Sequence, residues 1–228
     1  MAAEDDWDDT IVPRLMAAGA DLSKVHGLVL TADIDGTKTE RDLSLDHDTA
    51  TLEQFLRNHP AIRLVVIDPV SNYLGRANMV DEQSVRSVLA PLKGLANRLH
   101  VAIICVMHLN KKVELDAIHR ISGAMAFVGV ARMVWLCAPK PTADGKPSDE
   151  SVMVKVKGNI VQRKLKGLLF TTKVRYLTIE SKSTPIAFAE WLEKIDQSAD
   201  ELVSGSRERK KPPHRPAEPT PASNPMAE

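Results

Sequence analysis

The stretch Leu64-Val65-Val66-Ile67-Asp68-Pro69 decides the fold of this chain, because four apolar residues in a row are followed directly by an acid. A second apolar run, Val101-Ala102-Ile103-Ile104-Cys105-Val106-Met107, ends in the polar residue His108. Near-continuous apolar runs of this length are typical of parallel strands whose faces are both covered by helices. The two runs therefore predict neighbouring parallel strands that each deliver a polar side chain to the carboxyl edge of one sheet.

The residues between the two runs have the spacing of an amphipathic helix. From Asp81 onward the apolar residues recur at the helical interval, at Val85, Val88, Leu89, Leu92, Leu95, Ala96 and Leu99. A crossover of this length is what a parallel strand pair requires. Another helix is predicted over residues 48–58, capped by Asp48 and ended before Pro60. The sequence therefore predicts an α/β fold, with a parallel sheet core flanked by helices.

The other segments are assigned from their local patterns. Ahead of the acid-tipped run we expect a helix over residues 6–18, a strand over 25–30 and a loop over 31–44. After the His-tipped run we expect a helix over 122–129, an apolar strand over 133–138, antiparallel strands over 151–156, 168–172 and 175–179, and a helix over 187–195. Residues 1–195 would form one domain, and the polar, Pro-rich residues 196–228 a disordered tail.

The composition limits the classes of protein that this chain can belong to. With 228 residues and 43% hydrophobic content, the chain is long enough for one core. Lys+Arg 30 balance Asp+Glu 30, so net charge favours no partner. Cys105 and Cys137 lie inside apolar runs, which makes a disulfide scaffold or metal site unexpected. The acidic N-terminus and the lack of a long apolar stretch predict a cytoplasmic protein without a membrane span.

Asp68 is the first candidate for chemistry. A carboxylate at the end of a buried strand can hold Mg²⁺, directly or through a water, against the phosphates of a nucleotide. The alternative is an acid that caps the strand and begins the turn at Pro69. The residue alone does not decide between them.

Other polar residues occupy positions where they could act on phosphates. His108, with Asn110 and Lys111 beyond it, could contact a γ-phosphate and report its loss, although a lone His at a strand end is often structural. Arg132 could act on a neighbouring subunit's phosphates, or form a surface ion pair. Glu4 and Asp5 could polarise a water, or favour the N-terminus of the helix that follows them.

The order of these motifs resembles a known family. The resemblance rests on residues 4–15 and 18–22, the acid-tipped strand with residues 69–75, residues 106–111, and residues 123–132. These segments occur in the order seen in RepA-like members of the RecA-type AAA family ATPases, which include hexameric replicative helicases of plasmids, phages and mobile elements. The resemblance covers residues 2 to about 160.

The resemblance implies a role for each candidate. Glu4 looks like the catalytic carboxylate and Asp5 like its acidic neighbour. Asp68 resembles the Walker B acid that is associated with Mg²⁺. His108 resembles the sensor, with Asn110 beside the nucleotide, and Arg132 resembles the arginine finger. Lys157 and Asn159 are a weaker match to a Lys and an Asn of the family, and this match implies that Lys157 contacts the cofactor. ATP, Mg²⁺, a hexamer-type homo-oligomer and DNA, expected to be single-stranded, are the implied cofactors and partners.

One part of the family pattern has no counterpart in the sequence. The family places a strand, a G-x-x-x-x-G-K-[ST] loop and a helix before the Glu-Asp pair, and no stretch of this chain fits that loop. We therefore expect an incomplete RecA-like core that lacks the phosphate-loop strand and helix, with an antiparallel extension after it.

Three hypotheses follow from the sequence. The first is the C-terminal part of a RepA-like ATPase domain, inactive alone because the phosphate loop is missing. The second is a non-catalytic module that binds DNA or a replication partner. The third is an unrelated α/β domain.

Overall fold

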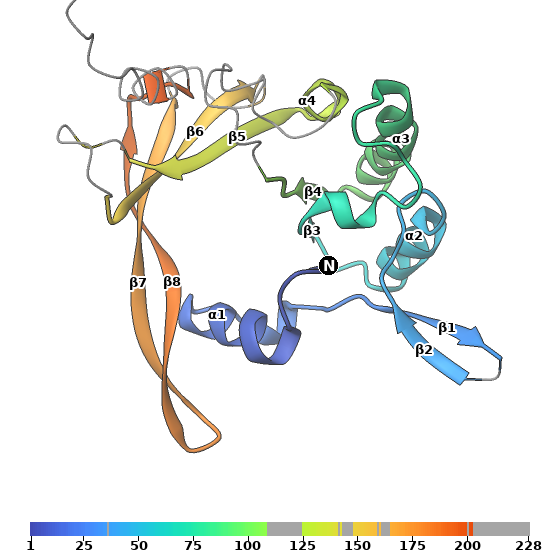
Figure 1. The fold of residues 1–228 in the computed structure, drawn as a ribbon, viewed down its shortest axis with the longest axis horizontal. Helices are drawn as coiled ribbons and strands as arrows, with labels where there is room; N and C mark the ends of the chain where they lie inside the picture. Colours follow the sequence, from blue (N-terminus) through green and yellow to red (C-terminus); the bar gives the residue numbers. More distant parts are fainter. Residues whose placement is uncertain are drawn as a thin grey trace, which may run out of the picture.

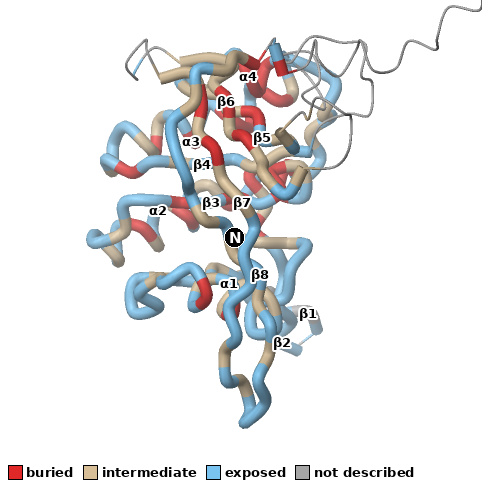
Figure 2. Tube along the Cα trace, turned by 90° about the vertical axis from the view of Figure 1, so that its left-hand side faces the viewer, coloured by how far each residue is buried: buried red, intermediate tan, exposed pale blue. Residues whose placement is uncertain are grey.

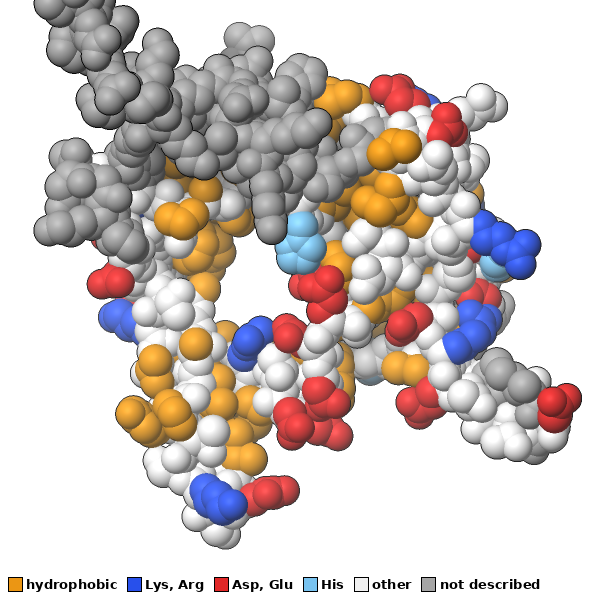
Figure 3. Space-filling model, viewed as in Figure 1, with side chains coloured by type: hydrophobic (Ala, Val, Ile, Leu, Met, Phe, Trp, Pro, Cys, Tyr) orange, Lys and Arg blue, Asp and Glu red, His pale blue; other side chains and the backbone are white. Residues whose placement is uncertain are grey.

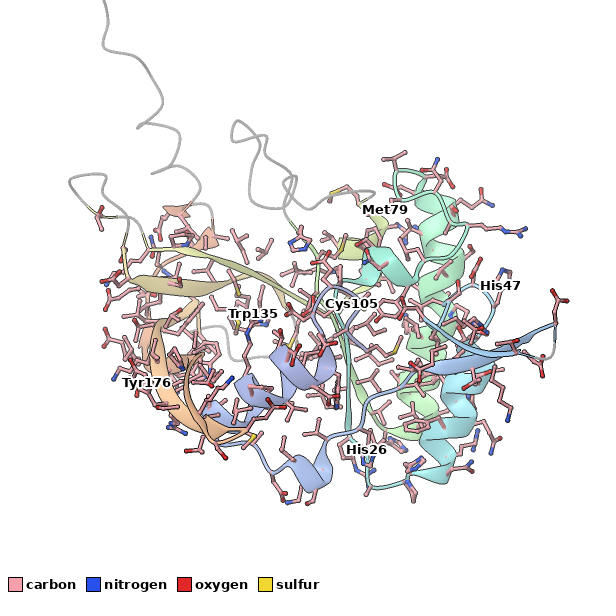
Figure 4. All side chains as sticks on the ribbon, turned by 60° about the horizontal axis from the view of Figure 1, so that its bottom comes forward. His26, His47, Met79, Cys105, Trp135 and Tyr176 are labelled. Atoms are coloured by element: carbon pink, nitrogen blue, oxygen red, sulfur yellow. The ribbon has the colours of Figure 1, made fainter. Side chains whose placement is uncertain are left out.

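The computed structural model describes residues 1–35, 37–108, 125–140, 142, 148–158, 160, 165–199 and 201–202. These residues form two groups of elements on opposite sides of the molecule (Figure 1), and the space-filling view shows a central opening between them (Figure 3). A parallel strand pair with its helices lies on one side, and an antiparallel sheet lies on the other. Tyr176 of the antiparallel sheet and His47 near the helices mark opposite sides of the molecule (Figure 4). The mixed α/β class predicted from the sequence is confirmed.

The parallel pair is the predicted strand–helix–strand unit. Strand β3 (Leu64–Ile67) pairs in parallel with β4 (Ala102–Cys105), with Leu64 opposite Ala102 and Ile67 opposite Cys105. Helix α3 (Glu82–Leu99) makes the crossover and begins where the Asp81 carboxylate accepts a hydrogen bond from the Ser84 N–H. Helix α2 (Thr49–Asn58) precedes β3. The apolar periodicity therefore predicted both helices and both strands.

The first residues of the chain extend this sheet on its other side. Ala2 forms a parallel bridge with Asp68, the residue that follows β3. The Ala3 N–H donates to the Asp68 carbonyl at 3.0 Å, and the Asp68 N–H donates to the Met1 carbonyl at 3.0 Å. β3 therefore lies between residues 1–3 and β4, and is hydrogen-bonded along both edges.

The helices cover only one face of the parallel pair. Val65 and Ile67 are buried in the same apolar core as Leu52 of α2 and Leu95 of α3. On the opposite face Leu64 is 50% exposed, Val66 39% and Ile104 49%. The prediction that helices cover both faces of the sheet was therefore wrong for the described residues. Figure 2 shows how buried and exposed residues are distributed along the chain.

The C-terminal half is a four-stranded antiparallel sheet. Its order is β5 (Met133–Pro139), β6 (Glu150–Gly158), β7 (Gly167–Ile179) and β8 (Lys182–Ile195). A second core forms on one face from Leu136, Val152, Val154 and Leu169, together with Ala199 and Leu202 of the segment after β8. Residues 203–228, most of the predicted tail, lie outside the described residues.

Two predictions for this half were wrong. The strands predicted over 168–172 and 175–179 are one strand, β7, and the helix predicted over 187–195 is part of strand β8. β8 pairs with β7 along most of its length across a turn in which Glu180 (φ 48°) and Ser181 (φ 64°) both adopt the left-handed region. The hydrogen bonds of this long hairpin override the helical propensity of Ala, Glu, Leu and Lys.

The N-terminal segments differ in part from the sequence prediction. The expected helix is present as a π-helical turn, η1 (Trp7–Ile11), followed by α1 (Val12–Ala17). A 3₁₀ turn, η2 (Leu22–Lys24), leads to an antiparallel hairpin of β1 (Leu30–Ile34) and β2 (Thr37–Arg41). The predicted strand over 25–30 and loop over 31–44 were therefore wrong, because cross-strand pairing orders a segment whose second strand is exposed along its whole length.

Asp48 fixes the hairpin to the helical side. Its carboxylate is nearly buried and accepts two hydrogen bonds from the Arg41 guanidinium, at 2.6 and 2.9 Å, and one from the Ser44 N–H at 2.8 Å. Asp48 also precedes α2, but its side chain makes no cap hydrogen bond to that helix. The Asp48 side chain, which was predicted to cap α2, therefore anchors Arg41 instead.

We expect Asp48→Ala to lower the free energy of unfolding at pH 7 by about 2 kcal/mol, because hydrogen bonds to a charged group are lost. Arg41 is then left with its hydrogen bond to the Asp42 carbonyl. Hydrogen bonding to Arg41 lowers the pKa of Asp48 below its ordinary value of 3.8. The stabilisation is therefore present above that value and is lost as the pH falls through the lower folded-state pKa. Urea unfolding at pH 7 and pH 3 measures both effects.

The control for this prediction is Asp149→Ala. The Asp149 side chain is exposed and makes no hydrogen bond or ion pair within the described residues. An equal loss of stability in both variants, or an effect of Asp48→Ala that does not depend on pH, would contradict the anchor role.

Candidate functional site

Three of the predicted site residues meet at one edge of the parallel sheet. Glu4 follows residues 1–3, Asp68 follows β3, and His108 lies beyond the end of β4. Because the three segments run in parallel, their carboxyl ends lie at the same edge. The Glu4 Oε2 and His108 Nε2 atoms are 3.3 Å apart, and both side chains are open to solvent. The structure therefore brings together residues 104 positions apart in the sequence.

Asp68 lies in an electrostatic field that opposes its negative charge. Partial burial raises the pKa of Asp68, and the carboxylates of Glu4 and Asp5 raise it further, while His108 acts in the opposite direction. The surroundings of Asp68, its partial burial first, therefore disfavour its ionised form. A site of this kind favours a bound cation, because a cation relieves the repulsion among the carboxylates.

Asp5 has a different environment from Glu4. Its Oδ2 atom accepts a hydrogen bond from Arg14 Nη1 of α1 at 2.9 Å. This ion pair is about half exposed, so it contributes little to stability by itself. Its geometric effect is to tie the backbone after Glu4 to α1. Asp5 is thus placed as a support beside the site.

The loop after Asp68 is held closely on the parallel sheet. The Val70 N–H donates to the Val106 carbonyl at 2.9 Å, and the 3₁₀ turn η3 (Val70–Tyr73) follows. The loop then turns at Gly75, whose φ is 63°. A Cβ atom at Gly75 would lie 2.1 Å from Oδ1 of Asp46, so only glycine fits there.

Arg132 and Lys157 lie in a different part of the fold. Arg132 is exposed in the connection between helix α4 (Ala126–Val130) and β5. The Lys157 ammonium on β6 donates to the carbonyls of Val128 and Gly129 at 2.7 and 3.2 Å. The structure thus places Lys157 on the end of α4, a position that the sequence did not indicate. Asn110, Lys111 and Asn159 lie outside the described residues.

The site fits a magnesium ion only in part. No group of three His, Cys, Asp or Glu side chains in the described part of the chain could hold a metal ion. Mg²⁺ needs only one or two carboxylates when phosphates and waters complete its shell, and Asp68 is suited to supply one. The residues that would cradle the phosphates are not found in the sequence, so a complete nucleotide site does not fit.

Comparison with known families agrees with this geometry. Residues 1–114 match the family model of the AAA domain, and this match spans half of the chain. The chain therefore belongs to the AAA domain family, an AAA-type P-loop ATPase family whose members generally bind ATP with Mg²⁺. The matched region includes Glu4, Asp68 and His108 and ends before Arg132 and Lys157. No curated protein matches the chain.

Two features of the site could not be read from local pattern. Residues 1–3 carry no strand signal, because a bridge of this length depends on the edge of β3 beside it. The contact of Lys157 with α4 depends on a partner 28 to 29 residues earlier in the chain.

Among the described helices, none is long and apolar enough to cross a membrane.

We expect Asp68→Asn to raise the free energy of unfolding at pH 7 by roughly 0.5–1 kcal/mol, the size of a partly exposed charge interaction. The pKa of Asp68 is raised in the folded protein, so its ionised form opposes folding. Stability is therefore lost as the pH rises from 3.8 through the folded-state pKa, and the gain in the variant disappears below pH 3.8.

Chemical unfolding of both proteins at pH 3, 5 and 7 measures the gain. Asp149→Asn serves as the control, because its exposed carboxylate lies in the antiparallel sheet region. A variant that is less stable than the parent at pH 7 would show that the Asp68 carboxylate makes a favourable interaction in the folded protein.

Proposed function

We propose that this chain is part of a RepA-like ATPase domain, in which Asp68 is the Walker B acid and Glu4 the catalytic carboxylate. The observation that carries the proposal is the order of residues 1–3, β3 and β4, with Glu4, Asp68 and His108 at one edge. In this role Asp68 would hold Mg²⁺ directly or through a water. Glu4 would orient and polarise the attacking water.

His108 is the proposed sensor of this site. Its contact with Glu4 joins the residue that acts on water to the segment beyond β4. Movement of His108 toward a phosphate would break this contact, and its return would restore it. Arg132, on the separate α4–β5 connection, would then act on the site of a neighbouring subunit, as an arginine finger does.

The central opening supports the proposal that a phosphate-loop strand and helix complete this domain. β4 and β5 are edge strands in the described sheets, and both border the opening (Figure 1). Hydrophobic side chains line both sides of it (Figure 3), and Cys105 and Trp135 lie in the central part of the molecule (Figure 4). A strand inserted there could pair with these edges, and the helix that follows it could cover the exposed Leu64, Val66 and Ile104 on the face of the parallel pair.

The wider role would be that of a replicative helicase of a plasmid, phage or mobile element. We propose a hexamer-type ring acting on single-stranded DNA. This proposal rests on the order of the motifs and on an arginine that would act between subunits. The second candidate is a non-catalytic module that binds DNA or a replication partner. The absence of a phosphate-loop pattern from the sequence favours this second candidate.

We predict that the purified 228-residue chain neither binds ATP tightly nor hydrolyses it, because it has no phosphate cradle. Titration with a fluorescent ATP analogue in the presence of Mg²⁺, and a phosphate-release assay, test this. Turnover that is lost in Asp68→Asn or Arg132→Ala, and retained in the control Asp149→Asn, would show that the chain is active alone.

A further test separates the two candidates. We expect the DNA upstream of the Met1 codon to encode, in frame, a strand followed by G-x-x-x-x-G-K-[ST]. A chain extended to include that segment should bind ATP, and should lose turnover in Glu4→Gln. The lack of such a segment, with no ATP binding, would favour the non-catalytic module.

A further inference from the structure

The connection that carries Arg132 is short and lies between two ordered elements. Helix α4 ends at Val130, Ala131 is its C-cap, and β5 begins at Met133. The carbonyls in the last turn of a helix have no partner within the helix and carry a partial negative charge. The orientation of this helix end therefore sets the direction in which the chain leaves toward Arg132.

Lys157 holds the helix end. Its ammonium donates to the Val128 carbonyl at 2.7 Å and to the Gly129 carbonyl at 3.2 Å. A positively charged donor at the C-terminus of a helix satisfies free carbonyls and interacts favourably with the helix dipole. α4 has only five residues, so it has little stability of its own and depends on such contacts.

Lys157 also holds the other end of the connection. In the β5–β6 ladder Lys157 lies opposite Val134, and Met133 lies opposite Gly158. The register shifts between Val134 and Trp135, so the pairing at Lys157 is separate from the regular ladder that follows. A single residue thus contacts α4 through its side chain and β5 through its backbone, on the two sides of Arg132.

The face of α4 toward α3 is also fixed. Phe127 and Val128 are buried, and the Arg86 guanidinium of α3 lies 3.2 Å from the position that a Cβ atom would take on Gly129. α4 is therefore packed from α3 and capped from β6. The cap is the contact that connects the helix to the sheet.

We propose that Lys157 is the positioning residue of Arg132: it clamps the α4–β5 connection and sets where the guanidinium points. This role is separate from the cofactor contact that the resemblance implies for Lys157. It rests on the proposed function of Arg132, but its structural content can be tested without nucleotide.

The test is NMR spectroscopy of the full chain with ¹⁵N-labelled arginine. The Arg132 Nε–Hε signal is assigned by its loss in Arg132→Lys. We expect this signal to shift or broaden in Lys157→Met and to be restored toward its original position in Lys157→Arg. Amide exchange at residues 130–132 should become about tenfold faster in Lys157→Met, since a charge-assisted hydrogen bond is lost.

The matched control is Lys155→Met on the same strand, because the Lys155 side chain makes no hydrogen bond or ion pair within the described residues. It should leave the Arg132 signal unchanged. If Lys157→Met does not fold, Lys157→Ala, which also removes the donor, gives the same comparison.

Two results would overturn the proposal. One is an Arg132 signal and local exchange that are the same in the parent and in the folded Lys157 variant. The other is a change that spreads evenly over β5 and β6 and is not reversed in Lys157→Arg, which is what general destabilisation gives. Because no ATP is used, failure here leaves the proposed ATPase site to be judged by its own tests.

Discussion

The structure depends on the hydrogen bonding of β3 along both of its edges. Residues 1–3 pair with one edge and β4 with the other, all in parallel. Parallel pairing fixes both the neighbours and the direction of each strand. The residues that follow the strands therefore lie along one edge of the sheet. Glu4, Asp68 and His108 therefore share an edge although they are distant in sequence. Their placement depends on this backbone arrangement more than on any contact between their side chains.

The same arrangement leaves one face of the parallel pair exposed in the part of the chain that the structure describes. α2 and α3 bury Val65 and Ile67, whereas Leu64, Val66 and Ile104 remain exposed on the other side. Full burial of one such side chain contributes about 1.5–3 kcal/mol, so a covered face would stabilise the parallel unit by several kcal/mol. The exposed face and the acidic edge belong to the same strands. An element that covers the face is therefore well placed to complete the site as well.

The sequence predicted the parallel unit well because its signals are local. The helical spacing from Val85 to Leu99 and the apolar runs before Asp68 and His108 each lie within one element. The β7–β8 hairpin was predicted poorly because its order comes from pairing between strands, and residues 187–195 have helical propensity. The β1–β2 hairpin was missed because its second strand, β2, is exposed along its whole length. Local pattern fails where a partner strand decides the structure.

The sequence by itself determined the α/β class, the strand–helix–strand unit and the acid and histidine at its strand ends, because apolar periodicity and strand length are properties of short segments. Only the tertiary structure decided that Glu4 contacts His108, that Asp5 pairs with Arg14, and that Lys157 caps α4. Each of these contacts joins elements that fold against one another. Their partners are chosen by packing and strand order, and neither is encoded in the spacing of neighbouring residues.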